Sequence, residues 1–190
     1  MWATEGDGIY NGNLPSRFGE EPFAGAWFAS ADSGPYEELN LYVNYGVELG
    51  PVYGYAGYTR LEFPEDNESD NEISVGMELN GAGYVKPALD YRFSTEADGG
   101  FMELSVNTEF ILLNGRLALG PYIMEGFDFG YASEQHDGPN HFQIGIDFTW
   151  ALTGGRRIVG SVAHSRALED VRNDGLGDVS WLLIGVAAEL

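Results

Sequence analysis

The sequence contains no cysteine and a single lysine, Lys86. The absence of cysteine excludes a disulfide framework and any thiol chemistry. Lysine and arginine together number 9 against 30 aspartates and glutamates, so the formal net charge is -21. A surface of that sign excludes broad binding of nucleic acid, because phosphate backbones require basic side chains. We therefore expect no nucleic-acid partner.

Long apolar runs are also absent. No stretch reaches the roughly 18 residues that a membrane-spanning helix requires, and the start at Met1 shows neither the basic residues nor the apolar stretch of a secretory signal. A Walker loop, a Rossmann glycine pattern and an HExxH motif are missing too. We predict no cofactor. The absence of long apolar runs does not exclude a membrane β-barrel, because each of its strands needs only about 9–11 residues, half of them apolar.

What the sequence does contain is alternation of apolar and polar residues. In the segment 72–79, for example, every second residue is apolar and the residues between are polar or glycine. Successive side chains of a strand point to opposite faces, so each such segment has one apolar and one polar face. The pattern predicts strands at 22–30, 36–49, 52–61, 72–79, 84–93, 101–112, 117–131, 141–152, 156–166 and 179–190.

The connections between these segments alternate in kind. Tight turns with glycine at hand fall at 49–51, 80–83, 113–115 and 153–155, and longer, mostly acidic loops fall at 31–35, 62–71, 94–100, 132–140 and 167–178. Short turns at one end and long loops at the other are typical of outer-membrane barrels, whereas a Greek-key sandwich mixes the two ends. We predict an all-β fold, a closed antiparallel up-and-down β-barrel of the transmembrane type with about 10–12 strands.

This barrel is expected to occupy 21–190 as one domain. Residues 1–20 are weakly patterned and rich in Gly, Asn and Asp. They are interpreted as a tail, a short strand at 8–14 or an inward plug. The apolar faces are expected to contact lipid, with Trp150 near a tight turn and Tyr58 and Phe93 near long loops, where aromatic girdles lie. The alternative is that the apolar faces meet one another across a sandwich core.

The opposite faces carry charged residues, which would point into a packed polar lumen. A buried charge without a partner is costly, so we expect Lys86 and Arg92, which flank Asp90, to bridge acids of neighbouring strands. An excess of acid would favour cations. The predicted lumen network comprises Glu78, Lys86, Asp90, Arg92, Glu103, Glu109, Asp128 and Asp147.

Two loop clusters have residue types that can carry chemistry. Asp66, Glu68 and Asp70 offer oxygen ligands for a cation, without the spacing of an EF-hand. His136, Asp137 and His141 gather near one loop and would suit a metal, a proton transfer or a surface hydrolase site. Solvated loops are the simpler interpretation of both clusters. We predict no catalytic residues and no resident metal.

Several runs carry a resemblance. The segments FAGAWFAS (23–30), YEELNLY (36–42), YGYAGYT (53–59), DNEI (70–73), PALDY (87–91), GY (130–131) and HDGPNH (136–141) resemble a family of uncharacterised bacterial outer-membrane, porin-like β-barrels. The likeness covers most of the chain from Gly8 onward. It implies the fold and a place in the bacterial outer membrane, and it implies no catalytic residues. Members of that family also carry a signal peptide and an additional first strand, and they usually end in an aromatic residue where this chain has Leu190.

These observations predict an integral outer-membrane β-barrel that is not an enzyme. It would serve as a narrow, cation-favouring channel or as a structural surface protein, with outer-membrane lipid and inorganic cations as its partners. The alternative is a soluble or secreted acidic β-barrel that binds a small ligand, cations or a protein. A third hypothesis is a surface enzyme that uses His136, Asp137 and His141.

Overall fold

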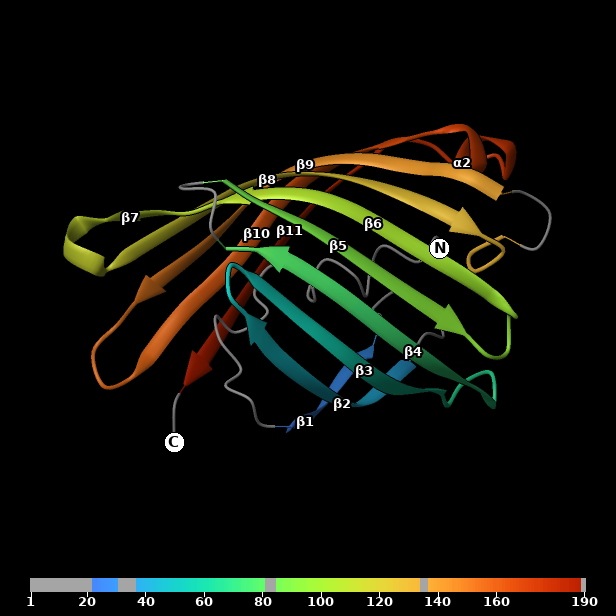
Figure 1. Cartoon of the computed structure of the whole chain (residues 1–190), viewed down its shortest axis with the longest axis horizontal. Helices are drawn as coiled ribbons and strands as arrows, with labels where there is room; N and C mark the ends of the chain where they lie inside the picture. Colours follow the sequence, from blue (N-terminus) through green and yellow to red (C-terminus); the bar gives the residue numbers. More distant parts are fainter. Residues whose placement is uncertain (1–21, 31–36, 81–84, 134–136, 189–190) are drawn as a thin grey trace.

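The computed structural model describes residues 22–30, 37–80, 85–133 and 137–188. They form one all-antiparallel sheet in up-and-down order, β1-β2-β3-β4-β5-β6-β8-β9-β10-β11, with β7 paired to β8 alone (Figure 1). A 3-10 turn, Leu113–Gly115, follows β7, and one short helix, α2 (Glu169–Asn173), lies between β10 and β11. The strands are β1 (Pro22–Ser30), β2 (Glu37–Leu49), β3 (Val52–Phe63), β4 (Glu68–Leu79), β5 (Val85–Ser94), β6 (Gly99–Thr108), β7 (Phe110–Leu112), β8 (Leu117–Phe129), β9 (Asp137–Ala151), β10 (Arg156–Ala167) and β11 (Val179–Ala188).

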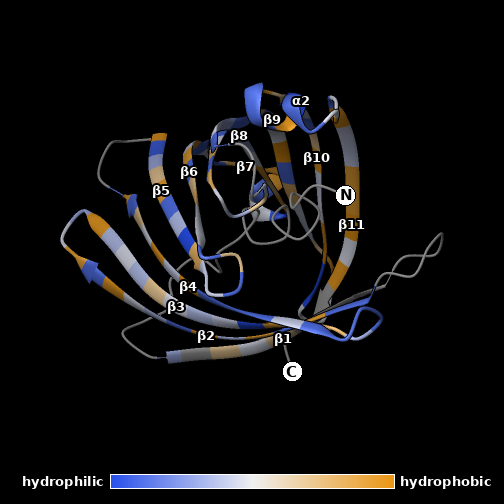
Figure 2. Cartoon of the chain, turned by 90° about the vertical axis from the view of Figure 1, so that its right-hand side faces the viewer, coloured by the Kyte–Doolittle hydropathy of each residue, from blue (hydrophilic) through white to orange (hydrophobic). Residues whose placement is uncertain are grey.

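The sheet is strongly curved and wraps around an interior (Figure 2). The hairpin that carries β7 projects at one end, and α2 lies at the other end (Figure 1). Within the described residues no ladder joins the two edge strands, β1 and β11, so the sheet is open there. The predicted all-β class and up-and-down order are confirmed, whereas closure into a barrel stays a prediction.

Each of the ten predicted segments contains a strand, but several boundaries were wrong. The predicted strand 101–112 is interrupted at Glu109, which separates β6 from β7. The loop expected at 62–71 is only a four-residue turn, because the β3–β4 ladder continues to the pair Phe63 and Glu68. A similar turn, 95–98, replaces the loop expected at 94–100. The two ends therefore differ less in loop length than the sequence suggested. The segment 8–14 lies outside the described residues.

The two faces of the sheet reverse the distribution usual in water-soluble proteins, in which apolar side chains are buried and polar side chains are exposed. On β9, Gln143 is 2% exposed, whereas its neighbours Phe142 and Ile144 are 38% and 50% exposed. On β4, Glu72 is buried while the next residue, Ile73, is 54% exposed. Along the strands, hydrophilic and hydrophobic residues alternate in Figure 2. The concave side of the curved sheet is thus polar and buried, and the convex side is apolar and exposed.

Glycine residues make the polar interior possible, because aromatic rings lie against them. A Cβ on Gly145 of β9 would stand 2.4 Å from the ring of Tyr122 on β8. Gly46 stands in the same relation to Tyr53, and Gly76 to Tyr55. Rings that cover a cross-strand glycine are a known way to stabilise strongly curved sheets. The richness of the chain in glycine and tyrosine therefore has a packing cause.

Replacement of Gly145 by valine tests this packing. The new side chain would displace the Tyr122 ring, and overpacking of this kind costs about 1–3 kcal/mol. We expect the free energy of unfolding, measured by urea titration, to fall by about that amount. The matched control is Gly120→Ala on β8, where the nearest atom to an added Cβ is 3.6 Å away. Equal effects of the two substitutions would contradict the role given to the ring contact.

Candidate functional site

The centre of the concave face is a row of side chains that crosses neighbouring strands. Tyr55 of β3 is opposite Gly76 of β4, which is opposite Asp90 of β5, which is opposite Glu103 of β6. Gly76 has no side chain to block the way, so Tyr55 reaches across β4 and its hydroxyl donates a hydrogen bond to Asp90. This row places two carboxylates, those of Asp90 and Glu103, directly beside each other.

Arg92 compensates for that concentration of acid. Its Nη2 atom lies 2.9 Å from Oε2 of Glu103, and their side chains are 14% and 2% exposed. A buried carboxylate requires a partner of this kind, because a lone charge away from water is strongly unfavourable. The interior thus contains a tyrosine–aspartate hydrogen bond from β3 to β5 and an arginine–glutamate ion pair from β5 to β6.

A cavity of about 570 Å³ lies against this row on the concave face. Its walls come from β2 to β6, β8 and β9, and they carry six carboxylates but only two bases, Lys86 and Arg92. Arg92 is already paired with Glu103, whereas Lys86 forms no ion pair among the described side chains. The acidic residues of the walls are Glu48, Glu72, Glu78, Asp90, Glu109 and Asp147.

A second polar cluster fills the interior beside β8, β9 and β10. Gln143 donates to the Tyr122 hydroxyl at 2.8 Å and accepts a hydrogen bond from Ser165. Nearer α2, Asn140 donates to Asp170 of the helix at 2.7 Å, and its own amide oxygen lies 2.8 Å from Nδ1 of His141. All of these groups are buried. This half of the interior is packed with hydrogen-bonded side chains, in contrast to the cavity.

The predicted lumen residues fall into three groups. Five of them line the cavity from within strands, and Glu109 lines it as an exposed residue between β6 and β7. Glu103 is buried beside Arg92. Asp128 is fully buried, but its carboxylate accepts hydrogen bonds from the backbone N–H groups of the turn 131–133, so it holds that turn. The five that line the cavity are Glu78, Lys86, Asp90, Arg92 and Asp147.

The two loop clusters do not assemble as metal sites within the described residues. Asp66 and Glu68 are exposed, and Asp70 accepts hydrogen bonds from the backbone N–H groups of Asn71 and Glu96. Asp137 is exposed at the start of β9. His136 lies outside the described residues.

His141 opens the predicted strand 141–152, but it does not face the loop cluster as the surface-site hypothesis requires. It belongs to β9, is fully buried, and stacks on Phe101 with ring centroids 6.2 Å apart. The strand begins earlier than predicted, because the ladder between β8 and β9 extends to Asp137, beyond the apolar alternation from which its start was placed at 141.

The sequence interpretation missed the tyrosines of the interior. Tyr55 and Tyr122 share the concave face with the charged residues, and Tyr131 donates from its hydroxyl to Glu72. A usable signal was present: in 52–61, Tyr53 and Tyr55 alternate with Ala56 and Tyr58, which places the first two on the polar face. Tyrosine was counted as apolar, although its hydroxyl suits a polar interior.

No family model matches the chain, and no curated protein matches it. In the described part of the chain, no helix combines the length and the apolar character needed to cross a membrane.

Proposed function

We propose that this chain is an integral outer-membrane β-barrel whose polar interior forms a narrow, cation-favouring path. The observation that carries the proposal is the reversed distribution of the two faces, in which buried polar groups lie inside the curve and large apolar side chains outside it. Water-soluble monomers rarely expose a continuous apolar surface of this kind. Hydrocarbon around the convex face would remove that cost. The resemblance to porin-like barrels agrees with this proposal.

The exposed apolar side chains extend across the whole sheet. They lie on every strand from β2 to β11, and they include Leu41 and Val43 on β2, Val75 and Met77 on β4, Leu104 and Val106 on β6, Ile144 and Ile146 on β9, and Leu182 and Ile184 on β11. Most strands are 10 to 15 residues long, which is enough to meet the roughly 9–11 residues that a tilted strand needs to span a bilayer. A belt around the entire convex face is what a lipid-embedded barrel requires.

Closure of the sheet is part of the proposal. The main path contains ten strands in antiparallel order, so β1 and β11 run in opposite directions. Pairing of these two strands would satisfy the backbone groups along both edges, which no membrane-embedded sheet can leave open. The curvature seen in Figure 2 favours such closure.

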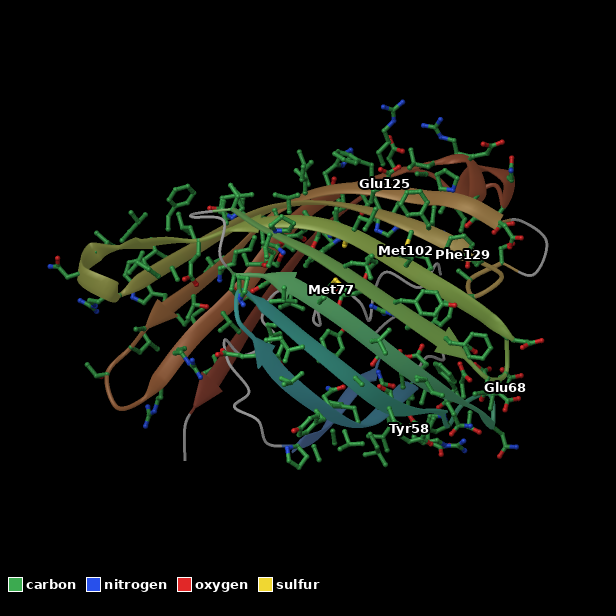
Figure 3. All side chains as sticks on the ribbon, viewed as in Figure 1. Tyr58, Glu68, Met77, Met102, Glu125 and Phe129 are labelled. Atoms are coloured by element: carbon green, nitrogen blue, oxygen red, sulfur yellow. The ribbon has the colours of Figure 1, made fainter. Side chains whose placement is uncertain are left out.

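Aromatic residues stand at one rim of the apolar face. Figure 3 places Tyr58 and Phe129 toward the end of the sheet that carries Glu68, whereas Met77 lies farther along it. Tyr58 and Phe129 are 42% and 49% exposed, and the Tyr58 hydroxyl donates to Asn71 at 2.7 Å. An apolar ring with a wet polar tip suits a lipid–water boundary.

Glu125 of β8 is one of several charged residues on the convex face, together with Arg60 of β3 and Arg166 of β10. Glu125 shares the convex face with Leu104 and Phe142, its partners on β6 and β9. Glu125 is four residues from the end of β8 at Phe129. Acidic residues near a boundary cost less than basic residues at the bilayer midplane, which makes this position compatible with the proposal.

The experiment combines two measurements on the purified chain. A closed barrel in detergent is expected to migrate differently on a gel before and after heating, and to conduct with cation preference in a planar bilayer. Glu78→Gln and Asp147→Gln together should lower the cation preference, because two carboxylates leave the cavity wall. The control is Glu65→Gln, in the exposed turn between β3 and β4.

Each outcome decides a separate part of the proposal. A chain that stays monodisperse and β-rich in plain buffer would reject membrane insertion and favour a soluble acidic β-protein. A heat-modifiable but electrically silent protein would reject the channel and leave a structural barrel. Anion preference would overturn the role given to the acidic cavity.

A further inference from the structure

A second row of side chains crosses neighbouring strands near the short turns and lines one end of the cavity. Tyr53 of β3 is opposite Glu48 of β2 on one side and Glu78 of β4 on the other. All three residues line the cavity. Neighbouring strands are about 4.8 Å apart, so the two glutamates flank the tyrosine at close range. The row is two residues from the turn at Gly50, so it stands at the short-turn mouth.

Tyr53 has a polar group without a partner. The residue is 8% exposed, and its hydroxyl is buried with no hydrogen bond among the described side chains. Its ring leans over Gly46 of β2, where an added Cβ would stand 2.1 Å from the hydroxyl oxygen. A buried hydroxyl that makes no hydrogen bond destabilises the folded chain, because its hydration is lost without replacement. A ligand that supplied the missing hydrogen bond would recover that lost stability.

The chemistry of the row selects a cation. Neither Glu48 nor Glu78 forms an ion pair among the described residues, and both are cross-strand partners of the aromatic residue Tyr53. Carboxylates attract positive charge, and the face of a tyrosine ring adds a cation–π contribution. A divalent metal fits poorly, because the described residues hold no group of three metal-ligating side chains. A planar or tetrahedral cation with several N–H donors fits better, since it can donate to both carboxylates and to the hydroxyl.

We propose that Glu48, Tyr53 and Glu78 bind a small organic cation of the ammonium or guanidinium class at the short-turn mouth of the cavity. The inference deepens the proposed cation path and rests on it in one respect, namely that the cavity belongs to that path. Lys86 lines the same cavity and carries the same charge as the ligand. It therefore opposes binding, and its removal strengthens the site.

The test is equilibrium dialysis of the full chain against radiolabelled methylguanidinium at low ionic strength, in the medium that keeps the protein monodisperse. We expect saturable binding that Glu48→Gln and Glu78→Gln each weaken by about tenfold or more, since each removes a charge-assisted hydrogen bond. Tyr53→Phe, which removes only the hydroxyl, should weaken it less, and Lys86→Gln should strengthen it. Glu65→Gln, outside the cavity, is the matched control and should change nothing.

Urea, a neutral molecule of nearly the same shape as guanidinium, serves as the control for the ligand. The proposal requires that urea does not compete with the probe at low concentration and that added salt weakens binding of the probe. This comparison uses the unaltered protein, so it decides the question even where a variant fails to fold by circular dichroism. Absence of saturable binding, equal competition by urea, or binding unchanged in both glutamate variants would overturn the inference.

The result is independent of the bilayer experiment. Binding of methylguanidinium by an electrically silent protein would keep the site and reject the channel. Conductance without binding would keep the channel and reject the site.

Discussion

Replacement of Arg92 by methionine is expected to lower the free energy of unfolding by about 3–5 kcal/mol. The guanidinium group is 2.9 Å from Glu103, whose side chain is 2% exposed. Methionine keeps most of the volume but removes the positive charge, so Glu103 keeps its negative charge in a site shielded from water. Asp90 lies directly opposite Glu103 on the next strand and would add repulsion. Urea titration in the medium where the chain folds reversibly measures the loss.

The exposed pair Arg60 and Glu62 provides the matched control. Their atoms Nε and Oε1 are 2.7 Å apart, but their side chains are 34% and 41% exposed. Because water screens such a pair, Arg60→Met should cost no more than about 1 kcal/mol. The double substitution Arg92→Met and Glu103→Leu should recover much of the stability lost by Arg92→Met alone, since no lone charge is then buried. Equal costs for Arg92→Met and Arg60→Met would show that Arg92 does not compensate a buried acid.

Strand positions could be predicted from the sequence because period-2 alternation is a local property. Each of the ten predicted segments contains a strand, and the segment 22–30 was predicted with the bounds of β1. Strand ends were less predictable where polar residues continue the ladder. The pairing of Phe63 with Glu68 is one such case, since a hairpin extends as long as backbone groups find partners, whatever the side chains.

The helix α2 was missed for a different reason. It has only five residues, Glu169–Asn173, too few for a period of 3.6 to show in the sequence. It is held by tertiary contacts instead: Val171 is 2% exposed, and Asp170 accepts a hydrogen bond from Asn140 of β9.

The composition of the interior was predictable, but its pairings were not. The same-face position of Asp90 and Arg92 follows from their spacing in one strand. The choice of Glu103 as the partner of Arg92 depends on the register between β5 and β6, and a slip of one residue would turn every side chain to the other face. The bond from Tyr55 to Asp90 spans three strands across Gly76, which no local pattern reveals.

Substitution of Ile144 by arginine is expected to have the second largest effect, and it distinguishes a lipid environment from water. Ile144 is 50% exposed at the middle of β9, on the convex face, and its β8 partner is Ile123. Arginine at the bilayer midplane costs about 2–4 kcal/mol in a transmembrane barrel. We therefore expect Ile144→Arg to lower the free energy of unfolding in phospholipid vesicles by about that amount and to reduce the fraction of chain inserted.

The matched control is Leu176→Arg, in the loop between α2 and β11, where the side chain is 39% exposed. The side chains of Ile144 and Leu176 are similarly exposed in the isolated chain. Exposure alone therefore gives no reason for the two substitutions to differ in their effect on stability. In water, both substitutions would change stability by no more than about 0.5 kcal/mol. In a membrane, only Ile144 contacts hydrocarbon, because the loop lies beyond the strand ends. A small and equal effect at both positions would mean that the convex face is wet, and the proposed location would fail with it.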